Sequence, residues 1–253
     1  MQIVRGRTYL RDGAIERSHL SPDGRHRLAV DDSSWHLLNL NEEGRVCGCA
    51  RYLEHRNTTS FDALTLRTAA LALSDKWGSR VRAAVESELE VARRREVPYV
   101  EVGGWAIPEE RRCTADAARL ALAMFGLAQL FGGCVGVTTA TTRHHSSSIL
   151  RKIGGRPLEW DGAELPSYYD PQYGCQMEIL RFDSCVPRQR FSAWIEELQL
   201  SLLQTQVIWG GDGVSASPIG SVSTRLDGGL SSVPPELVRA TPVQAGSHRN
   251  SAT

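Results

Sequence analysis

The spacing of apolar residues along the chain changes several times between the two-residue period of strands and the longer period of amphipathic helices. Residues 35–40 and 46–53 are apolar runs joined by the polar turn Asn41-Glu42-Glu43-Gly44, a pattern that predicts a hairpin. Further elements follow from the same periodicities. We expect helices at residues 8–15, 63–75, 78–96, 114–131, 145–155 and 188–207, and strands at 99–107, 134–139, 156–160 and 175–182.

This order of elements predicts an α/β fold with a mixed sheet. Because strand–helix–strand units are almost always parallel and right-handed, the strands at 99–107 and 134–139 should be parallel neighbours. We divide the chain into a polar segment (1–30), the α/β domain (31–183), an amphipathic helix (184–209) and a tail (210–253). The tail is rich in Gly, Ser and Pro and is expected to be disordered.

The strand at 99–107 and the turn after it combine several unusual features. Glu101 interrupts an apolar run, and a buried carboxylate requires a partner. The pair Gly103-Gly104 predicts a bulge or the close approach of a ligand. Arg111 and Arg112 then precede the expected helix at 114–131, and a helix N-terminus next to arginines favours phosphate. The stretch therefore predicts a phosphate-binding cofactor site.

Composition excludes some classes of protein. The 253 residues carry a formal net charge of zero, which argues against nucleic-acid binding. We see no signal peptide and no apolar stretch long enough to span a membrane, and so expect a cytoplasmic protein. The six cysteines lack zinc spacing, so we expect no metal. Neither a Gly-x-Ser-x-Gly elbow nor a P-loop is present.

Two segments resemble motifs of the GNAT superfamily of N-acyltransferases. Residues 112–117, Arg-Cys-Thr-Ala-Asp-Ala, resemble its pyrophosphate-binding loop, Gln/Arg-x-x-Gly-x-Gly/Ala, with Ala115 in place of the central glycine. Lys152 and Gly154 match the later Lys-x-Gly pattern, whereas Leu150 stands where the family often has a catalytic tyrosine. The resemblance implies a mostly antiparallel sheet with a splayed parallel strand pair, flanked by helices.

A narrower resemblance concerns acyl-homoserine-lactone synthases and long-chain N-acyl amino acid synthases. Their Asp, Gly-x-x-Arg and Glu-x-x-Arg-Phe-x-Val signatures are similar to Asp31 or Asp32, to residues 48–51 and to residues 101–107 of this chain. Gly104 stands where these families carry arginine. The resemblance implies an acyl thioester donor, either acyl-CoA or an acyl carrier protein, and a small-molecule amine acceptor.

The resemblance also implies roles for individual residues. Glu101 corresponds to the base that deprotonates the amine; its other interpretation is a structural acid paired with an arginine such as Arg51. The acceptor would contact Asp32, Arg51 and Arg143. The residues expected to bind the donor are Trp105, Ile107, Arg111, Arg112, Thr114, Ala115 and Ala117.

Other interpretations stay open at this stage. The chain could be a catalytically silent acyl-CoA or acyl-carrier binding module, or an interaction protein that uses its C-terminal amphipathic helix, including for homodimerisation. Cys134 is better explained as a buried thiol than as a nucleophile. His144-His145 is better explained as a solvated helix start than as a ligand pair, because no further ligand lies at metal spacing.

Overall fold

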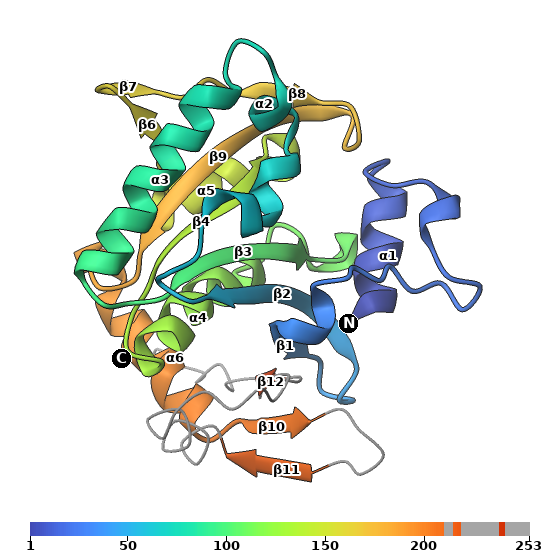
Figure 1. The fold of residues 1–253 in the computed structure, drawn as a ribbon. Coiled ribbons are helices and arrows are strands. Elements are labelled where there is room, and N and C mark those ends of the chain that lie inside the picture. Colours follow the sequence, from blue (N-terminus) through green and yellow to red (C-terminus); the bar gives the residue numbers. More distant parts are fainter. Residues whose placement is uncertain (210–214, 219–237, 241–253) are drawn as a thin grey trace, which may run out of the picture.

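The structure, a computed structural model, describes residues 1–209, 215–218 and 238–240. Its described strands form one ten-stranded sheet in the order β11-β10-β12-β1-β2-β3-β4-β9-β5, with β8 paired to β9, and a separate two-stranded ribbon, β6–β7 (Figure 1). The central strands are β1 (Trp35–Leu40), β2 (Val46–His55), β3 (Tyr99–Ala106), β4 (Val135–Thr141) and β9 (Cys175–Asp183). The short strands are β5 (Arg156–Pro157), β6 (Glu159–Trp160), β7 (Ala163–Glu164) and β8 (Tyr168–Asp170).

Helices cover both faces of the sheet. Helix α3 (Gly78–Arg94) packs on one face, and α4 (Asp116–Leu130) and α6 (Ser192–Leu203) pack on the other (Figure 1). Neighbouring residues of β3 point to opposite faces, as the pleat requires. Tyr99 belongs to the α3 core and Val100 to the α4 core, and both side chains are fully buried. This double burial explains the nearly continuous apolar run at the start of the strand.

The predicted mixed, mostly antiparallel sheet with one splayed parallel pair is confirmed. Strands β3 and β4 are parallel and pair only from Tyr99↔Val135 to Glu101↔Val137, although both strands continue beyond that point. The register between β2 and β3 shifts between Cys49 and Arg51, and Gly104 on β3 has φ of +61°. The predicted bulge at the glycine pair is thus present, and β3 leaves β4 where the bulge begins.

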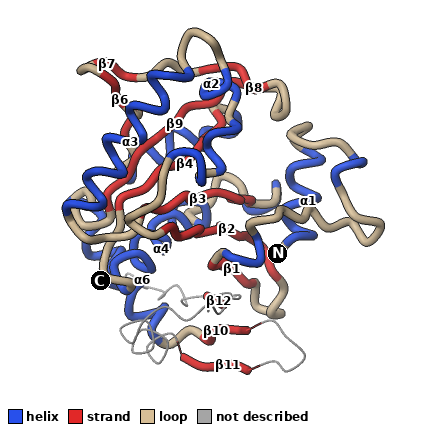
Figure 2. The backbone as a smooth tube through the Cα atoms, viewed as in Figure 1, coloured by secondary structure: helices blue, strands red, loops and turns tan. Residues whose placement is uncertain are grey.

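The N-terminal segment differs from the expectation of a polar segment with a short helix at 8–15. Helix α1 covers Gln2–Arg11 and lies against β2 and β3, at the carboxyl end of β3 (Figure 1). Gly6 lets the connection after the helix pack closely on α1, because a Cβ there would lie 2.9 Å from the carbonyl oxygen of Gly24. Because local propensity disfavours glycine inside a helix, tertiary contacts decide how far helix α1 extends. A long, mostly irregular connection then returns to β1 (Figure 2).

Two expected helices are also shorter than their patterns suggest. Residues 63–75 form 3-10 turns at Phe61–Ala63 and Thr65–Thr68 followed by α2 (Ala70–Leu73), because the N–H groups of Thr65 and Leu66 bond to Glu101. The helix expected at 188–207 is limited to α6, and Gln206 and Val207 belong to strand β10 (Gln206–Trp209). Helix α5 (Ser146–Ile153) agrees with its prediction.

Part of the expected disordered tail is described. Strands β11 (Ser215–Pro218) and β12 (Val238–Ala240) add to the sheet edge beside β10 and β1. The rest of 210–253 lies outside the described residues. Within the described part of the chain, no helix is long and apolar enough to cross a membrane.

Candidate active site

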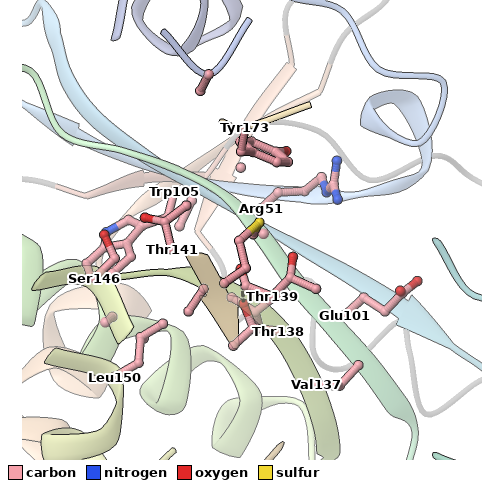
Figure 3. Close-up of a pocket in the computed structure, with 18 of the residues that line it drawn as sticks. Arg51, Glu101, Trp105, Val137, Thr138, Thr139, Thr141, Ser146, Leu150 and Tyr173 are labelled. Atoms are coloured by element: carbon pink, nitrogen blue, oxygen red, sulfur yellow. Dashed lines mark hydrogen bonds between the residues drawn. The ribbon is translucent and has the colours of Figure 1, made fainter. Parts of the chain in front are cut away.

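A cavity of about 520 Å³ lies where β3 and β4 separate. Its walls come from β2, β3, β4, α4 and α5, and α1 covers it with Thr8 and Tyr9. In Figure 3, Trp105, Ser146 and Leu150 lie on one side, and Arg51, Glu101 and Thr139 on the other. The cavity therefore has chemically different ends within one continuous space.

The apolar end follows helix α4. Ala117, Ala121 and Phe125 lie one turn apart on the same face of the helix and all line the cavity. Ala117 and Phe125 are eight residue steps apart, which corresponds to about 12 Å along the helix axis. The ring of Phe125 packs 6.0 Å from that of Phe182 and closes this end. Its other apolar lining residues include Val102, Met124, Ile149, Leu150 and Ile153.

Arg51 lines the polar end without a full set of partners. Its side chain is only 9% exposed, and its Nε and Nη1 atoms have no hydrogen-bond partner. Its nearest carboxylate, on Asp31, lies 3.9 Å from Nη1. Burial lowers the pKa of Arg51, and Asp31 opposes this only in part. A buried guanidinium with unpaired N–H groups favours an anionic ligand beside it.

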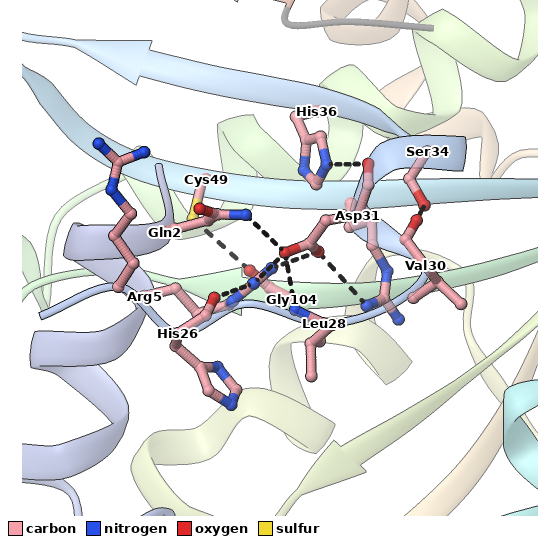
Figure 4. Close-up of polar contacts among 12 residues, drawn as sticks. Gln2, Arg5, His26, Leu28, Val30, Asp31, Ser34, His36, Cys49 and Gly104 are labelled. Atoms are coloured by element: carbon pink, nitrogen blue, oxygen red, sulfur yellow. Dashed lines mark hydrogen bonds and ion pairs between the residues drawn. The ribbon is translucent and has the colours of Figure 1, made fainter. Parts of the chain in front are cut away.

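Asp31 cannot compensate Arg51 fully, because it is already bound by Arg5. Arg5 donates to both carboxylate oxygens, at 2.9 and 2.5 Å, and Gln2 and the N–H of Leu28 also donate to Asp31 (Figure 4). Burial alone would raise the pKa of Asp31, but the hydrogen bonds and charge of Arg5 lower it below its usual range. The network ties α1 to the chain just before β1.

Asp32, which was expected to contact the acceptor, lies away from the cavity. Asp32 is exposed and does not line the cavity, whereas its neighbour Asp31 is buried. The 3-10 turn Asp31–Ser33 directs the two side chains differently, and only Asp31 meets Arg5. The sequence motif allowed both residues; neither lines the cavity, and only Asp31 pairs with Arg5.

Glu101 lines the cavity, but its oxygen atoms are already occupied. The carboxylate accepts hydrogen bonds from the N–H groups of Thr65 (2.8 Å) and Leu66 (2.7 Å) and from the Thr65 hydroxyl (2.7 Å). A ring nitrogen of His55 lies 2.9 Å away. Burial would raise the pKa of Glu101, yet these hydrogen bonds, led by the one from His55, lower it. A carboxylate so stabilised is a weak base.

The expected donor-binding residues are separated in space. Trp105, Ile107, Arg112 and Ala117 line the cavity, as does the expected acceptor residue Arg143. Arg111, Thr114 and Ala115 do not. The Arg111 guanidinium lies 2.7 Å from the Asp116 carboxylate, without the alignment of a hydrogen bond. The Thr114 hydroxyl accepts a hydrogen bond from the N–H of Asp116, the first residue of α4.

The mouth of the cavity is crossed by ionic contacts that the sequence did not suggest. Arg112 donates to both carboxylate oxygens of Asp12, at 2.8 and 2.7 Å, and Arg143 donates to the carbonyl of Asp12. Asp12 follows α1, so these contacts join the N-terminal segment to the loops before α4 and α5. Nothing in the polar sequence around Asp12 signals this long-range contact.

Cys134, the cysteine that the sequence offered as a nucleophile, does not line the cavity. The described residues contain no cluster of three or more potential metal ligands. Cys134 is fully buried, and burial raises the pKa of its thiol to about 12, which disfavours the nucleophilic thiolate. The buried thiol of Cys134 therefore does not supply the cavity with a nucleophile.

No family model and no curated protein matches the chain. Among solved structures, it is similar to BjaI, a CoA-dependent acyl-homoserine lactone synthase with SAM and isopentyl-CoA bound, at 17% identity over 77% of this chain and 81% of that chain (TM-score 0.47). It is also similar to FeeM, an N-acyl amino acid synthase from uncultured soil microbes, at 14% identity over 72% and 87% (TM-score 0.45).

Proposed function

We propose that this protein is an N-acyltransferase that moves an acyl group from a thioester, carried by coenzyme A or an acyl carrier protein, to a small amine. The observation that carries the proposal is the cavity between the diverging ends of β3 and β4. Where the strands diverge, backbone groups of residues 102–106 no longer pair with β4, and an extended ligand can lie beside them. One end of this space is apolar and the other holds a buried cation.

The donor fits along α4. Its acyl chain would occupy the apolar end between Ala117 and Phe125, and an extended octanoyl or decanoyl chain has about the length of that wall. Arg112 at the mouth would contact the donor phosphate. Backbone N–H groups near Trp105 and Ile107 would bond the thioester oxygen, and one such donor contributes about 3 kcal/mol to the transition state.

The acceptor fits at the polar end. Arg51 lines this end, and among the described residues its charge is paired only with Asp31 at 3.9 Å, so we propose an amine that also carries a carboxylate, as an amino acid does. The amine attacks the thioester carbonyl carbon, a C–N bond forms, the C–S bond breaks, and the thiol leaves with the proton that the amine gives up. No covalent enzyme intermediate is needed, because the thioester is already activated.

Glu101 is better explained as a positioning residue than as the base. Its hydrogen bonds hold Thr65 and Leu66, which form part of the cavity wall. The filled oxygens and lowered pKa of Glu101 also leave a second candidate function, a silent module that binds acyl thioesters without turnover. Steady release of free thiol in the presence of an amine would exclude that candidate.

The test is acyl transfer by the purified protein with octanoyl-CoA and an octanoylated acyl carrier protein, measured as thiol release and by mass spectrometry of the N-acyl product. Acceptors are supplied in pairs, each amino acid beside the amine that lacks its carboxylate. We expect a preference for the amino acid.

Arg51→Met should raise the KM for the amino acid about ten- to a hundredfold and leave the decarboxylated amine little affected, since a hydrogen bond to a charged group is worth about 1.5 to 3 kcal/mol. Arg45→Met is the matched control, because Arg45 lies in the same hairpin but is exposed and pairs with Glu43. Equal losses for both acceptors would contradict the role of Arg51, and absence of any product would contradict the function.

A further inference from the structure

Asp12 occupies the position at the cavity mouth where an anion would be held. Both of its carboxylate oxygens accept from Nη2 of Arg112. His144 approaches the same carboxylate, with Nε2 3.4 Å from Oδ1, and its Nε2 also lies 3.2 Å from Nη1 of Arg112. Arg143 donates to the carbonyl oxygen of Asp12. The carboxylate of Asp12 is therefore held by one arginine and approached by one histidine, while a second arginine binds the backbone carbonyl of the same residue.

The contact is partly shielded from water. The side chains of Asp12 and Arg112 are 15% and 20% exposed, so their ion pair is less screened than a surface pair. Asp12, Arg112, Arg143 and His144 all line the cavity. His144 and His145 have φ of +53° and +61°, a conformation that costs energy in residues other than glycine. The strained turn keeps His144 beside the mouth.

The same contact fastens the N-terminal segment over the cavity. Asp12 directly follows α1, and Tyr9 of this helix lines the cavity and donates to the carbonyl of Trp105 (3.4 Å). Arg11 also pairs with Glu109, but these two side chains are 60% and 53% exposed. The ion pair of Asp12 is thus the more shielded of the two ionic links between this segment and the loop before α4.

We propose that the Asp12 carboxylate is an internal competitor for the phosphate of the donor, and that a phosphorylated donor displaces it from Arg112 and His144 and thereby releases the segment that covers the cavity. The phosphate site is then shared between the loops before α4 and α5, and Arg111 has no part in it. This inference rests on the proposed function only for the identity of the phosphate-bearing ligand.

The coupling works in both directions. If donor binding requires Asp12 to leave, removal of the Asp12 charge must strengthen donor binding by the same free energy. Asp12→Asn keeps the shape of the side chain and removes its charge. We expect the variant to bind coenzyme A about tenfold more tightly, within the usual range of coupling between sites. Pantetheine, which lacks the phosphates, should bind both proteins equally.

Glu109→Gln is the matched control, since it removes the neighbouring ion pair with Arg11 without touching Arg112. It should leave the affinity for coenzyme A unchanged. Titration calorimetry with coenzyme A and pantetheine measures these affinities on the full chain. Hydrogen exchange of peptides from residues 1–30 measures the release: coenzyme A should speed exchange in the wild type, whereas Asp12→Asn should exchange fast without ligand.

Equal affinity of the wild type and Asp12→Asn for coenzyme A would overturn the inference, as would slower exchange of residues 1–30 when coenzyme A binds. A tenfold gain in affinity that also appears with Glu109→Gln would overturn it too, because loosening of the segment would then suffice. Acyl transfer with unchanged affinities would leave the proposed function intact and reject the competitor. A tenfold gain in the affinity for coenzyme A without any acyl transfer would support the competitor role of Asp12 and reject the proposed function.

Discussion

Replacement of Glu101 by glutamine should lower the free energy of unfolding of the protein, whatever the effect of the substitution on turnover. Each carboxylate oxygen is the acceptor for two neighbours: Thr65 and Leu66 supply three hydrogen bonds of 2.7 to 2.8 Å, and His55 lies at 2.9 Å. The glutamine amide has one oxygen in place of two, so its NH2 group must face two donors. Two lost hydrogen bonds to a buried charge, at about 1.5 to 3 kcal/mol each, amount to about 3 to 6 kcal/mol.

Urea unfolding followed by tryptophan fluorescence measures this loss. With a slope of about 1 to 3 kcal/mol per molar for small proteins, the midpoint should fall by at least about 1 M. Glu54→Gln is the matched control. Glu54 is the neighbouring acid on β2, its carboxylate accepts no hydrogen bond from the residues that the structure describes, and burial raises its pKa. That substitution should leave stability equal or higher.

The pH dependence gives a second measurement on the same pair. Because the pKa of Glu101 in the folded state is below its ordinary value of 4.5, the carboxylate stabilises the fold above that value and loses the contribution as pH falls through its folded pKa. Glu101→Gln should therefore lose less stability on acidification than the wild type. A Glu101→Gln protein with an unchanged urea midpoint and no turnover would refute the positioning role and support Glu101 as the base.

Two further predictions concern the ends of the cavity. Phe125→Ala should move the donor preference from octanoyl towards tetradecanoyl chains, measured by mass spectrometry of products from mixed donors; Leu127→Ala, a buried residue of α4 outside the cavity lining, should cost similar stability without that change. Burial and the charge of Arg5 lower the pKa of His26 from 6.5 to about 4. Between these two pH values the unfolded chain binds a proton that the folded chain does not. The free energy of unfolding should therefore fall by up to about 3 kcal/mol between pH 7 and pH 4. His26→Gln should flatten this part of the curve, and an unchanged slope would contradict the assignment.

The apolar pattern was sufficient to predict most helices and strands between β1 and α5. The hairpin of β1 and β2, the buried strands β3 and β4 and helices α3, α4 and α5 lie close to their expected ranges. The glycine pair correctly predicted the bulge, because Gly104 adopts a φ that other residues avoid. A side chain at position 104 would also meet Arg51 and Arg5, at 3.2 and 3.4 Å from its Cβ, which is consistent with glycine where related motifs carry arginine.

The partners of the charged residues could not be predicted in this way. Glu101 was open to two interpretations, a base or an acid paired with an arginine such as Arg51. Its observed partners are His55, Thr65 and Leu66, the last two 36 and 35 residues earlier, while Arg51 faces Asp31. Arg112 was expected to face a phosphate, but it meets Asp12, 100 residues away.

The sequence by itself therefore determined the elements, their order and the place where the sheet opens, because these depend on local periodicity and backbone freedom. The tertiary structure alone decided which charges are paired, that Arg51 is left buried with open N–H groups, and that the polar N-terminal segment covers the cavity. Charge pairing depends on distances between residues far apart in the chain, and no local pattern encodes them.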